Sequence, residues 1–299
     1  MKRAVSISLG STKRDKSVEI ELLGEQVRIE RIGTDGDMEK AAQLYRELDG
    51  KVDAFGVGGA DLAVHADNRV YPLHSVKPMV RYVKKTPLVD GSGLKDTVEA
   101  GLAEFVDQEV GLGDRPRRVL LTAGITRWGM SMSFLDANYD CIFGDLMFGL
   151  GIPIRIHSER AVKILGALLL PIVSRLPFEW LYPTGEEQEI RTPKWIKDYE
   201  WATVIAGDCN YITHSMPDDM TDKIIVTNTT TDADVRLFKS LGVKTLVTST
   251  MVYDGRSFGT NMMEAALVAV AGKGRTLTKA EILSMIDEIE ITPQMQTLN

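Results

Sequence analysis

The feature that most constrains the fold is the alternation of short Val-, Ile- and Leu-rich runs with longer amphipathic stretches. The apolar runs have the composition of strands buried on both faces. In residues 37–48, apolar residues recur on one helical face and Asp37 can cap the helix. This alternation is typical of an α/β protein in which parallel strands are joined by crossover helices.

The same patterns predict the individual elements. The predicted strands are residues 4–9, 26–32, 52–57, 87–89, 119–122, 152–156, 202–206, 224–227 and 245–248. The predicted helices are residues 37–48, 95–109, 159–169, 232–241, 261–271 and 279–289. The segment 139–145 is a further candidate strand with Asp145 at its end, and the polar C-terminal tail is expected to fray.

One segment stands out as a domain boundary. Residues 111–118 are rich in Gly, Pro and charge, and they precede the strongly apolar run 119–122. A length of 299 residues agrees with two domains of ordinary size. We therefore expect two α/β units, residues 1–113 and 114–299, with a ligand cleft between them.

Composition restricts the partners. The chain carries 35 Lys and Arg against 42 Asp and Glu, a formal charge of −7, which disfavours nucleic-acid binding. The longest apolar run, residues 164–173, is about half of the ~20 residues that a bilayer span needs. The N-terminus lacks a secretory apolar region, and Cys141 and Cys209 have neither zinc-site nor disulfide-framework spacing. We expect a cytoplasmic protein without membrane contact.

Two turns that follow predicted strands contain residues suited to anions. Ser11 and Lys13 offer a hydroxyl and a cation to an anionic substrate, although a solvated turn explains them equally well. Residues 56–61 are glycine-rich, so they can form either a tight turn or a close approach to a ligand.

The turn after the strand 119–122 is where a Rossmann domain binds the pyrophosphate of a dinucleotide. Gly124 and Gly129 are present there without the fingerprint spacing, and Thr126 and Arg127 lie between them. We predict that these four residues bind a cofactor.

The end of the predicted strand 152–156 is the place expected for the adenosine ribose. His157, Ser158 and Arg160 follow that strand and no acid ends it, which favours NADP over NAD. Ser158 can alternatively act only as a helix cap.

Two ionisable residues adjoin turn signals. Lys77 and Asp90 could share a substrate hydroxyl as a general acid and base. The alternatives are a solvated loop lysine and a turn-forming aspartate.

The order of these features resembles the shikimate/quinate 5-dehydrogenase family. The family's Asn-Thr-Asp-Gly-x-Gly stretch is similar to residues 88–93, which assigns its catalytic Asp to Asp90, and Lys77 is the nearest match to its catalytic Lys. Its Asn-Thr-Thr stretch near the nicotinamide resembles residues 226–230, which assigns cofactor contacts to Asn228 and Thr229. Its late helix is similar to residues 259–264, where Asn261 and Glu264 are candidate substrate residues and Glu264 replaces a Gln.

The resemblance implies an α/β substrate domain at residues 1–113 and a Rossmann-like, doubly wound nucleotide-binding domain at residues 114–299. It implies an NADP- or NAD-dependent dehydrogenase of a small hydroxylated carbocycle or hydroxy acid, as a possible homodimer with a small-molecule substrate. The alternatives are a cofactor-independent lyase or isomerase acting on an anionic substrate, and a ligand-binding protein that lost the chemistry.

Overall fold

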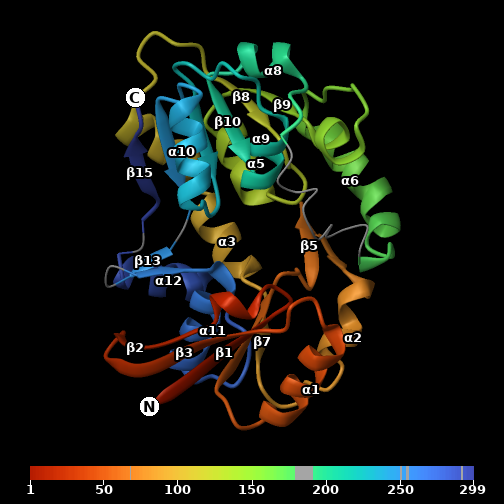
Figure 1. Ribbon diagram of the computed structural model, residues 1–299, viewed down its shortest axis with the longest axis vertical. Helices are drawn as coiled ribbons and strands as arrows, with labels where there is room; N and C mark the ends of the chain where they lie inside the picture. Colours follow the sequence, from red (N-terminus) through yellow and green to blue (C-terminus); the bar gives the residue numbers. More distant parts are fainter. Residues whose placement is uncertain (68, 179–190, 250, 254–255, 291) are drawn as a thin grey trace.

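Two parallel-rich sheets, each covered by helices on both faces, form the computed structural model (Figure 1). The structure describes residues 1–67, 69–178, 191–249, 251–253, 256–290 and 292–299. The strand order is β2-β3-β1-β4-β7 in the first sheet and β15-β12-β11-β10-β8-β9 in the second. The α/β class with a doubly wound parallel sheet is therefore confirmed.

The elements have the following bounds. The first sheet contains β1 (Lys2–Ser8), β2 (Lys16–Leu22), β3 (Glu25–Gly33), β4 (Ala54–Gly58) and β7 (Leu88–Val89). The second contains β8 (Arg118–Leu121), β9 (Asp140–Phe143), β10 (Val204–Gly207), β11 (Ile224–Thr227), β12 (Thr245–Thr248) and β15 (Gln294–Thr297). Two hairpins are formed by β5 (Ala63–Ala66) with β6 (Arg69–Pro72) and by β13 (Met251–Tyr253) with β14 (Arg256–Phe258). The helices are α1 (Met38–Leu48), α2 (Lys77–Val80), α3 (Ser92–Glu99), α4 (Leu102–Phe105), α5 (Trp128–Asp136), α6 (Glu159–Val173), α8 (Ile196–Trp201), α9 (Cys209–Ser215), α10 (Asp232–Ser240), α11 (Thr260–Ala271) and α12 (Lys279–Glu288). Short 3-10 turns are η1 (Thr12–Arg14) and η2 (His74–Val76), and π-helical turns are η3 (Val106–Val110) and η4 (Asp145–Gly149).

Side chains alternate across each central strand and so build a core on both faces of both sheets. In β1, Val5 and Ile7 join the core beneath α1 and α2, whereas Ala4 faces the core formed with α11 and α12. In β10, Val204 lies in the core that includes α5 and α6, and Ile205 in the core that includes α9 and α10. Strands buried on both faces read as nearly continuous apolar runs, which is why their positions were predictable.

The last two helices return to the first sheet, as the blue elements beside the red strands in Figure 1 show. Met263 of α11 and Ile282 of α12 pack in the same core as Ala4 and Ile29 of the first sheet. The sequence analysis placed these helices within the unit 114–299, whereas in space they pack on the first sheet. Apolar periodicity identifies a helix face to be buried without saying which sheet buries it.

Three predicted elements differ in the structure. The segment 152–156 forms only an isolated bridge from Ile156 to Phe143, because β9 already occupies the edge beside β8. The predicted helix 95–109 is interrupted after Glu99 and ends in the π-helical turn η3. The tail expected to fray forms β15, which pairs antiparallel with β12.

Candidate functional site

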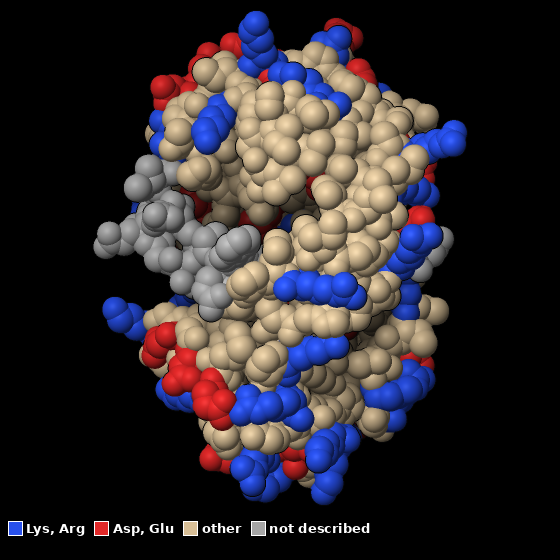
Figure 2. All heavy atoms as spheres, turned by 90° about the vertical axis from the view of Figure 1, so that its right-hand side faces the viewer, with Lys and Arg blue, Asp and Glu red and all other residues tan. Residues whose placement is uncertain are grey.

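A cavity of about 330 Å³ lies where the carboxyl ends of strands from both sheets meet. Its lining comes from the segments after β4, β7, β8, β10, β11 and β12 and from the start of α11: Val57, Gly59, Ala60, Asp61, Asp90, Lys95, Arg127, Asp208, Asn228, Thr229, Ser249, Thr260 and Asn261. Figure 2 shows a hollow between the upper and lower halves of the molecule, with acidic atoms visible inside it. Crevices at the carboxyl ends of parallel strands are the usual ligand sites of open α/β sheets.

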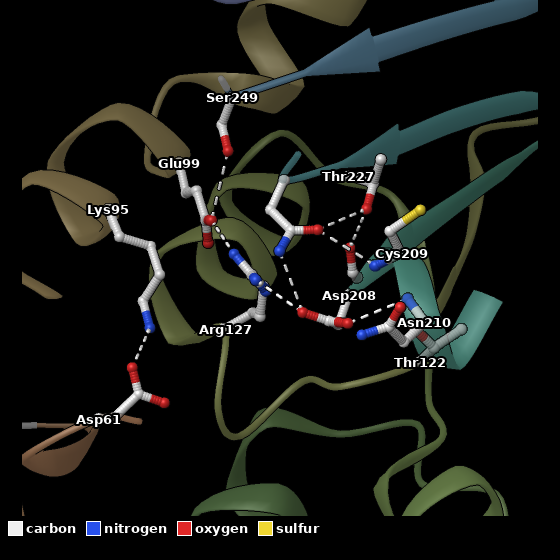
Figure 3. A network of polar contacts seen from close by, with 12 residues as sticks. Asp61, Lys95, Glu99, Thr122, Arg127, Asp208, Cys209, Asn210, Thr227 and Ser249 are labelled. Carbon is white, nitrogen blue, oxygen red and sulfur yellow. Dashed lines mark hydrogen bonds and ion pairs between the residues drawn. The ribbon is translucent and has the colours of Figure 1, made fainter. Parts of the chain in front are cut away.

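Lys95 and two aspartates form the charged part of the cavity that belongs to the first unit. Lys95 Nζ lies 3.8 Å from Asp61 Oδ1 (Figure 3). Asp90 Oδ2 accepts the Leu62 N–H at 2.6 Å and Oδ1 accepts the Ser92 N–H at 2.9 Å, so its carboxylate is held at the start of α3. Burial lowers the pKa of Lys95, but attraction to Asp61 and to acidic groups on its own helix outweighs burial and raises that pKa above its usual value. Lys95 is therefore an ammonium group at neutral pH.

Arg127 is the centre of the charged part that belongs to the second unit (Figure 3). Its Nη1 donates to Glu99 Oε1, and its Nη2 donates to Asp208 Oδ2 at 2.9 Å. Ser249 Oγ lies 3.5 Å from the same oxygen of Glu99, whereas Oε2 of Glu99 has no hydrogen-bond partner among the described residues. Burial lowers the pKa of Arg127, but Glu99 and Asp208 raise it well above its usual range.

Asn228 connects this network to the end of β11. Its Nδ2 donates to Asp208 Oδ2 at 3.1 Å, and its Oδ1 accepts the Cys209 N–H at 3.1 Å. Thr229 lines the cavity beside it. The structure thus brings Arg127, Asn228 and Thr229 to one wall, as the sequence analysis expected of cofactor-binding residues.

Two predicted residues of α11 lie at or near the opposite wall. Asn261 lines the cavity, and its Nδ2 donates to Ser6 Oγ at 2.6 Å. Glu264 is one turn further from the cavity, where its Oε2 accepts the Leu94 N–H at 3.3 Å. Burial raises the pKa of Glu264 to about 7, and the nearby carboxylate of Asp90 adds to the rise.

Three predicted substrate or catalytic residues lie elsewhere. Lys77 is an exposed residue of the short helix α2 and does not line the cavity, so Lys95 replaces it as the lysine beside Asp90. Ser11 accepts the Lys13 N–H at 3.2 Å as the cap of η1, and the Lys13 side chain is exposed. Neither Ser11 nor Lys13 is a lining residue.

The predicted ribose site is also not assembled. Ser158 caps α6 by accepting the Ala161 N–H at 3.2 Å, and His157 and Arg160 are exposed. These residues do not follow the second strand of the sheet, because that strand is β9 rather than the segment 152–156.

The turn after β8 does not fit the pyrophosphate of a dinucleotide. Ile125 N–H donates to Asp145 Oδ1 at 2.8 Å, and the Arg127 guanidinium is held by Glu99 and Asp208. Gly124 and Gly129 face packed protein atoms, and Thr126 is exposed away from the cavity lining.

Five polar lining residues were not among the predicted site residues: Asp61, Lys95, Asp208, Ser249 and Thr260. Asp208 and Ser249 directly follow β10 and β12, so the first polar residue after each parallel strand was a usable signal. Lys95 had no comparable signal, because it lies within a helix. No group of His, Cys, Asp and Glu in the described ranges could hold a metal ion, and none of the described helices is both long and apolar enough to cross a membrane.

The sequence matches two described families. Residues 93–298 match a domain of unknown function, DUF8754, and residues 3–90 match another, DUF8753. The chain belongs to the DUF8754 family. The two matches meet between β7 and α3, beside the cavity-lining Asp90.

No curated protein matches the sequence. Among solved structures, the chain is similar to a putative malic enzyme at 12% identity and a TM-score of 0.40, and to an NAD-dependent malic enzyme from Thermotoga maritima at 12% and 0.41. Each of these similarities covers 96% of this chain and 76% of the other. A galactofuranose-binding protein is similar at 11% identity and a TM-score of 0.36, covering 97% of this chain and 99% of that one. Similarities this weak indicate nothing about what the cavity binds.

Proposed function

We propose that the protein is an enzyme that binds a small, neutral polyhydroxylated compound in the cavity and transfers a proton to or from one of its hydroxyl groups. The observation that carries this proposal is the pair of Lys95 and Asp61 at the cavity wall, whose charged atoms lie 3.8 Å apart. Asp90 stands on the same wall.

The separation of this pair suits a bridging hydroxyl group. A distance of 3.8 Å exceeds the roughly 3.2 Å limit of an N–H···O hydrogen bond, so the two groups attract each other as an ion pair without a direct hydrogen bond between these atoms. A substrate hydroxyl between them can accept from Lys95 and donate to a carboxylate of Asp61 or Asp90. The carboxylate then removes the proton while the ammonium stabilises the negative charge on oxygen.

Size and charge define the class of ligand. A volume of about 330 Å³ lies at the lower end of the roughly 300–1,000 Å³ usual for ligand pockets. Three aspartates line the cavity, and one of its two cations, Arg127, is already paired with two carboxylates. This arrangement favours a neutral polyol, such as a hydroxylated carbocycle or a sugar, over a strongly anionic substrate.

Proton transfer from a hydroxyl group is a step shared by isomerase and lyase reactions, in which the electron pair left on oxygen forms a carbonyl group as a neighbouring bond to carbon breaks. The NADP- or NAD-dependent dehydrogenase predicted from the sequence would use the same substrate cavity, but it also requires a dinucleotide. It stays a prediction, as does the ligand-binding protein without catalysis.

The test compares two lysine variants. Wild type is screened by ligand-observed NMR against neutral cyclic polyols and monosaccharides, with myo-inositol and D-galactose as named probes and quinate as the anionic carbocycle. Lys95→Met removes the ammonium from the cavity, and Lys77→Met removes an exposed ammonium of α2 as the matched control. We expect at least a tenfold loss of polyol affinity in Lys95→Met and wild-type affinity in Lys77→Met.

Once a probe binds, its turnover is followed by NMR. Loss of general acid–base catalysis typically lowers the rate by about 10²–10⁴-fold, which is the expected effect of Asp61→Asn. Binding without any turnover would leave a ligand-binding protein. Equal affinity of wild type and Lys95→Met for every bound probe would refute the site.

A further inference from the structure

We infer that the carboxylate of Asp145 occupies the anion position at the turn between β8 and α5, so that this turn is closed to the pyrophosphate of a dinucleotide. The second unit thus retains the sheet of a nucleotide-binding domain while one of its own side chains takes the place of the phosphate. This goes beyond the proposed function, which concerns the substrate cavity.

The backbone between β8 and α5 forms a single turn before α5 begins at Trp128. Arg127 N–H donates to Ala123 O at 3.1 Å, and Ser131 N–H donates to Arg127 O at 3.0 Å. Ile125 lies inside this turn, ahead of the helix, and its N–H is not the group that closes the turn. In dinucleotide-binding folds amide groups of the corresponding turn hold the pyrophosphate. Here the Ile125 N–H donates to Asp145 Oδ1 at 2.8 Å instead.

The glycines of the turn are required by packing. A Cβ atom on Gly124 would lie 2.8 Å from Phe143 Cδ1 and 2.9 Å from Asp145 Oδ2. A Cβ atom on Gly129 would lie 2.8 Å from the carbonyl oxygen of Asp96 in α3. Both contacts are too close for any side chain, so protein atoms fill the space that a cofactor loop leaves open for its ligand.

Asp145 is fixed in this position by the sheet. It directly follows Gly144, whose N–H donates to Leu121 O at the end of β8 at 2.8 Å. Its Oδ2 is buried and has no hydrogen-bond partner among the described residues. Burial raises the pKa of Asp145 to about 6, and the N–H groups of Ile125 and Gly124 oppose that rise. At pH 7.5 the group is therefore mainly a buried anion, and a pyrophosphate beside it would face like-charge repulsion in a poorly solvated site.

The test starts with wild type at pH 7.5. NADH, NADPH and inorganic pyrophosphate are titrated separately by isothermal calorimetry, and the two dinucleotides also by nicotinamide fluorescence. We expect no saturable binding of either dinucleotide up to about 1 mM. A dissociation constant of that size corresponds to a binding free energy of about −4 kcal/mol. Saturable binding of NADH or NADPH to wild type would overturn the inference, whatever the variants do.

Asp145→Ala tests whether the carboxylate occupies an anion position. It frees the Ile125 N–H, and we expect pyrophosphate to bind at least tenfold more tightly than to wild type. Asp114→Ala removes an exposed aspartate outside the turn and serves as the matched control. A folded Asp145→Ala variant with wild-type pyrophosphate affinity would contradict the inference. If this variant does not fold, Asp145→Asn removes the negative charge while its oxygen can still accept from Ile125; we then expect a smaller gain in pyrophosphate affinity, and no gain would contradict the inference. Polyol binding through Lys95 is measured separately, so failure here is distinct from failure of the proposed function.

Discussion

Replacing Glu264 by Gln should change the pH dependence of stability in a defined direction. The Glu264 side chain is 5% exposed, and its Oε2 accepts the Leu94 N–H at the start of α3. Burial raises the pKa of this carboxyl from 4.5 to about 7. Folded and unfolded chains then bind different numbers of protons between these two pH values, which makes the free energy of unfolding depend on pH.

The sign follows from which state releases the proton first. Below about pH 4.5 the carboxyl is protonated in both states, so Glu264 contributes no pH dependence. As the pH rises from 4.5 to about 7, the unfolded chain releases its proton while the folded chain retains it, and stability falls. At about 1.36 kcal/mol per pH unit, the total loss is roughly 3 kcal/mol and is complete above pH 7.

Urea unfolding of wild type and Glu264→Gln at pH 5, 6, 7 and 8 measures this effect. Gln keeps an oxygen that accepts from Leu94 but has no proton to release, so the difference in free energy of unfolding should move in favour of the variant by roughly 3 kcal/mol as the pH rises. Glu288→Gln, on the exposed end of α12, is the control. If the free energy of unfolding depends on pH in the same way in wild type and in Glu264→Gln, the carboxyl is not held in its protonated form by burial. That result would refute the reasoning.

Two further predictions concern the cavity wall. Arg127→Met leaves the buried Glu99 without its cation, and we expect the free energy of unfolding in urea to fall by about 3–5 kcal/mol. The double variant Arg127→Met/Glu99→Leu should recover part of this loss. Full additivity of the two changes would contradict the pairing. Asn261→Ser shortens a side chain that both lines the cavity and donates to Ser6, so stability should fall by about 1 kcal/mol while polyol affinity falls about tenfold, and unchanged affinity would remove Asn261 from the site.

Most strands of both sheets were predictable from the sequence. The exceptions share one cause, which is that composition does not show which places in a sheet are free. Central strands such as β1 and β11 are buried on both faces and therefore appear as apolar runs. The edge strand β2 alternates polar and apolar residues, with Ile20 and Leu22 buried between exposed neighbours, and it was missed. The run 152–156 was predicted to be a strand from composition, but Ile152 and Ile154 are 40% and 52% exposed. Apolar composition indicates that burial is possible, while a free place in the sheet decides whether it occurs.

The site was predictable only where the chain leaves a strand. Asp90 and Asn228 directly follow β7 and β11, and both lie at the cavity. Lys95 was not recognised from the sequence, because it lies within a helix five residues after Asp90, whereas Lys77 adjoins a turn signal thirteen residues before Asp90. The direction in which α3 runs across the cleft decides between them, and that direction depends on its packing against α5 and α11.

The two charged clusters at the cavity, around Arg127 and around Lys95, differ in the geometry of their ion pairs. This difference indicates where a ligand binds. Arg127 donates to two carboxylates, and Asn228 donates to the same oxygen of Asp208 as Arg127 does. The other oxygen of Asp208 accepts the Asn210 N–H, so a ligand there would have to replace contacts that already exist. Lys95 and Asp61 lie 3.8 Å apart as an ion pair without a direct hydrogen bond, so a hydroxyl group can approach both charges without breaking one between them. The Arg127 cluster therefore holds the two units in register, and substrate contacts are expected to concentrate on Lys95, Asp61 and the wall formed by Asp90.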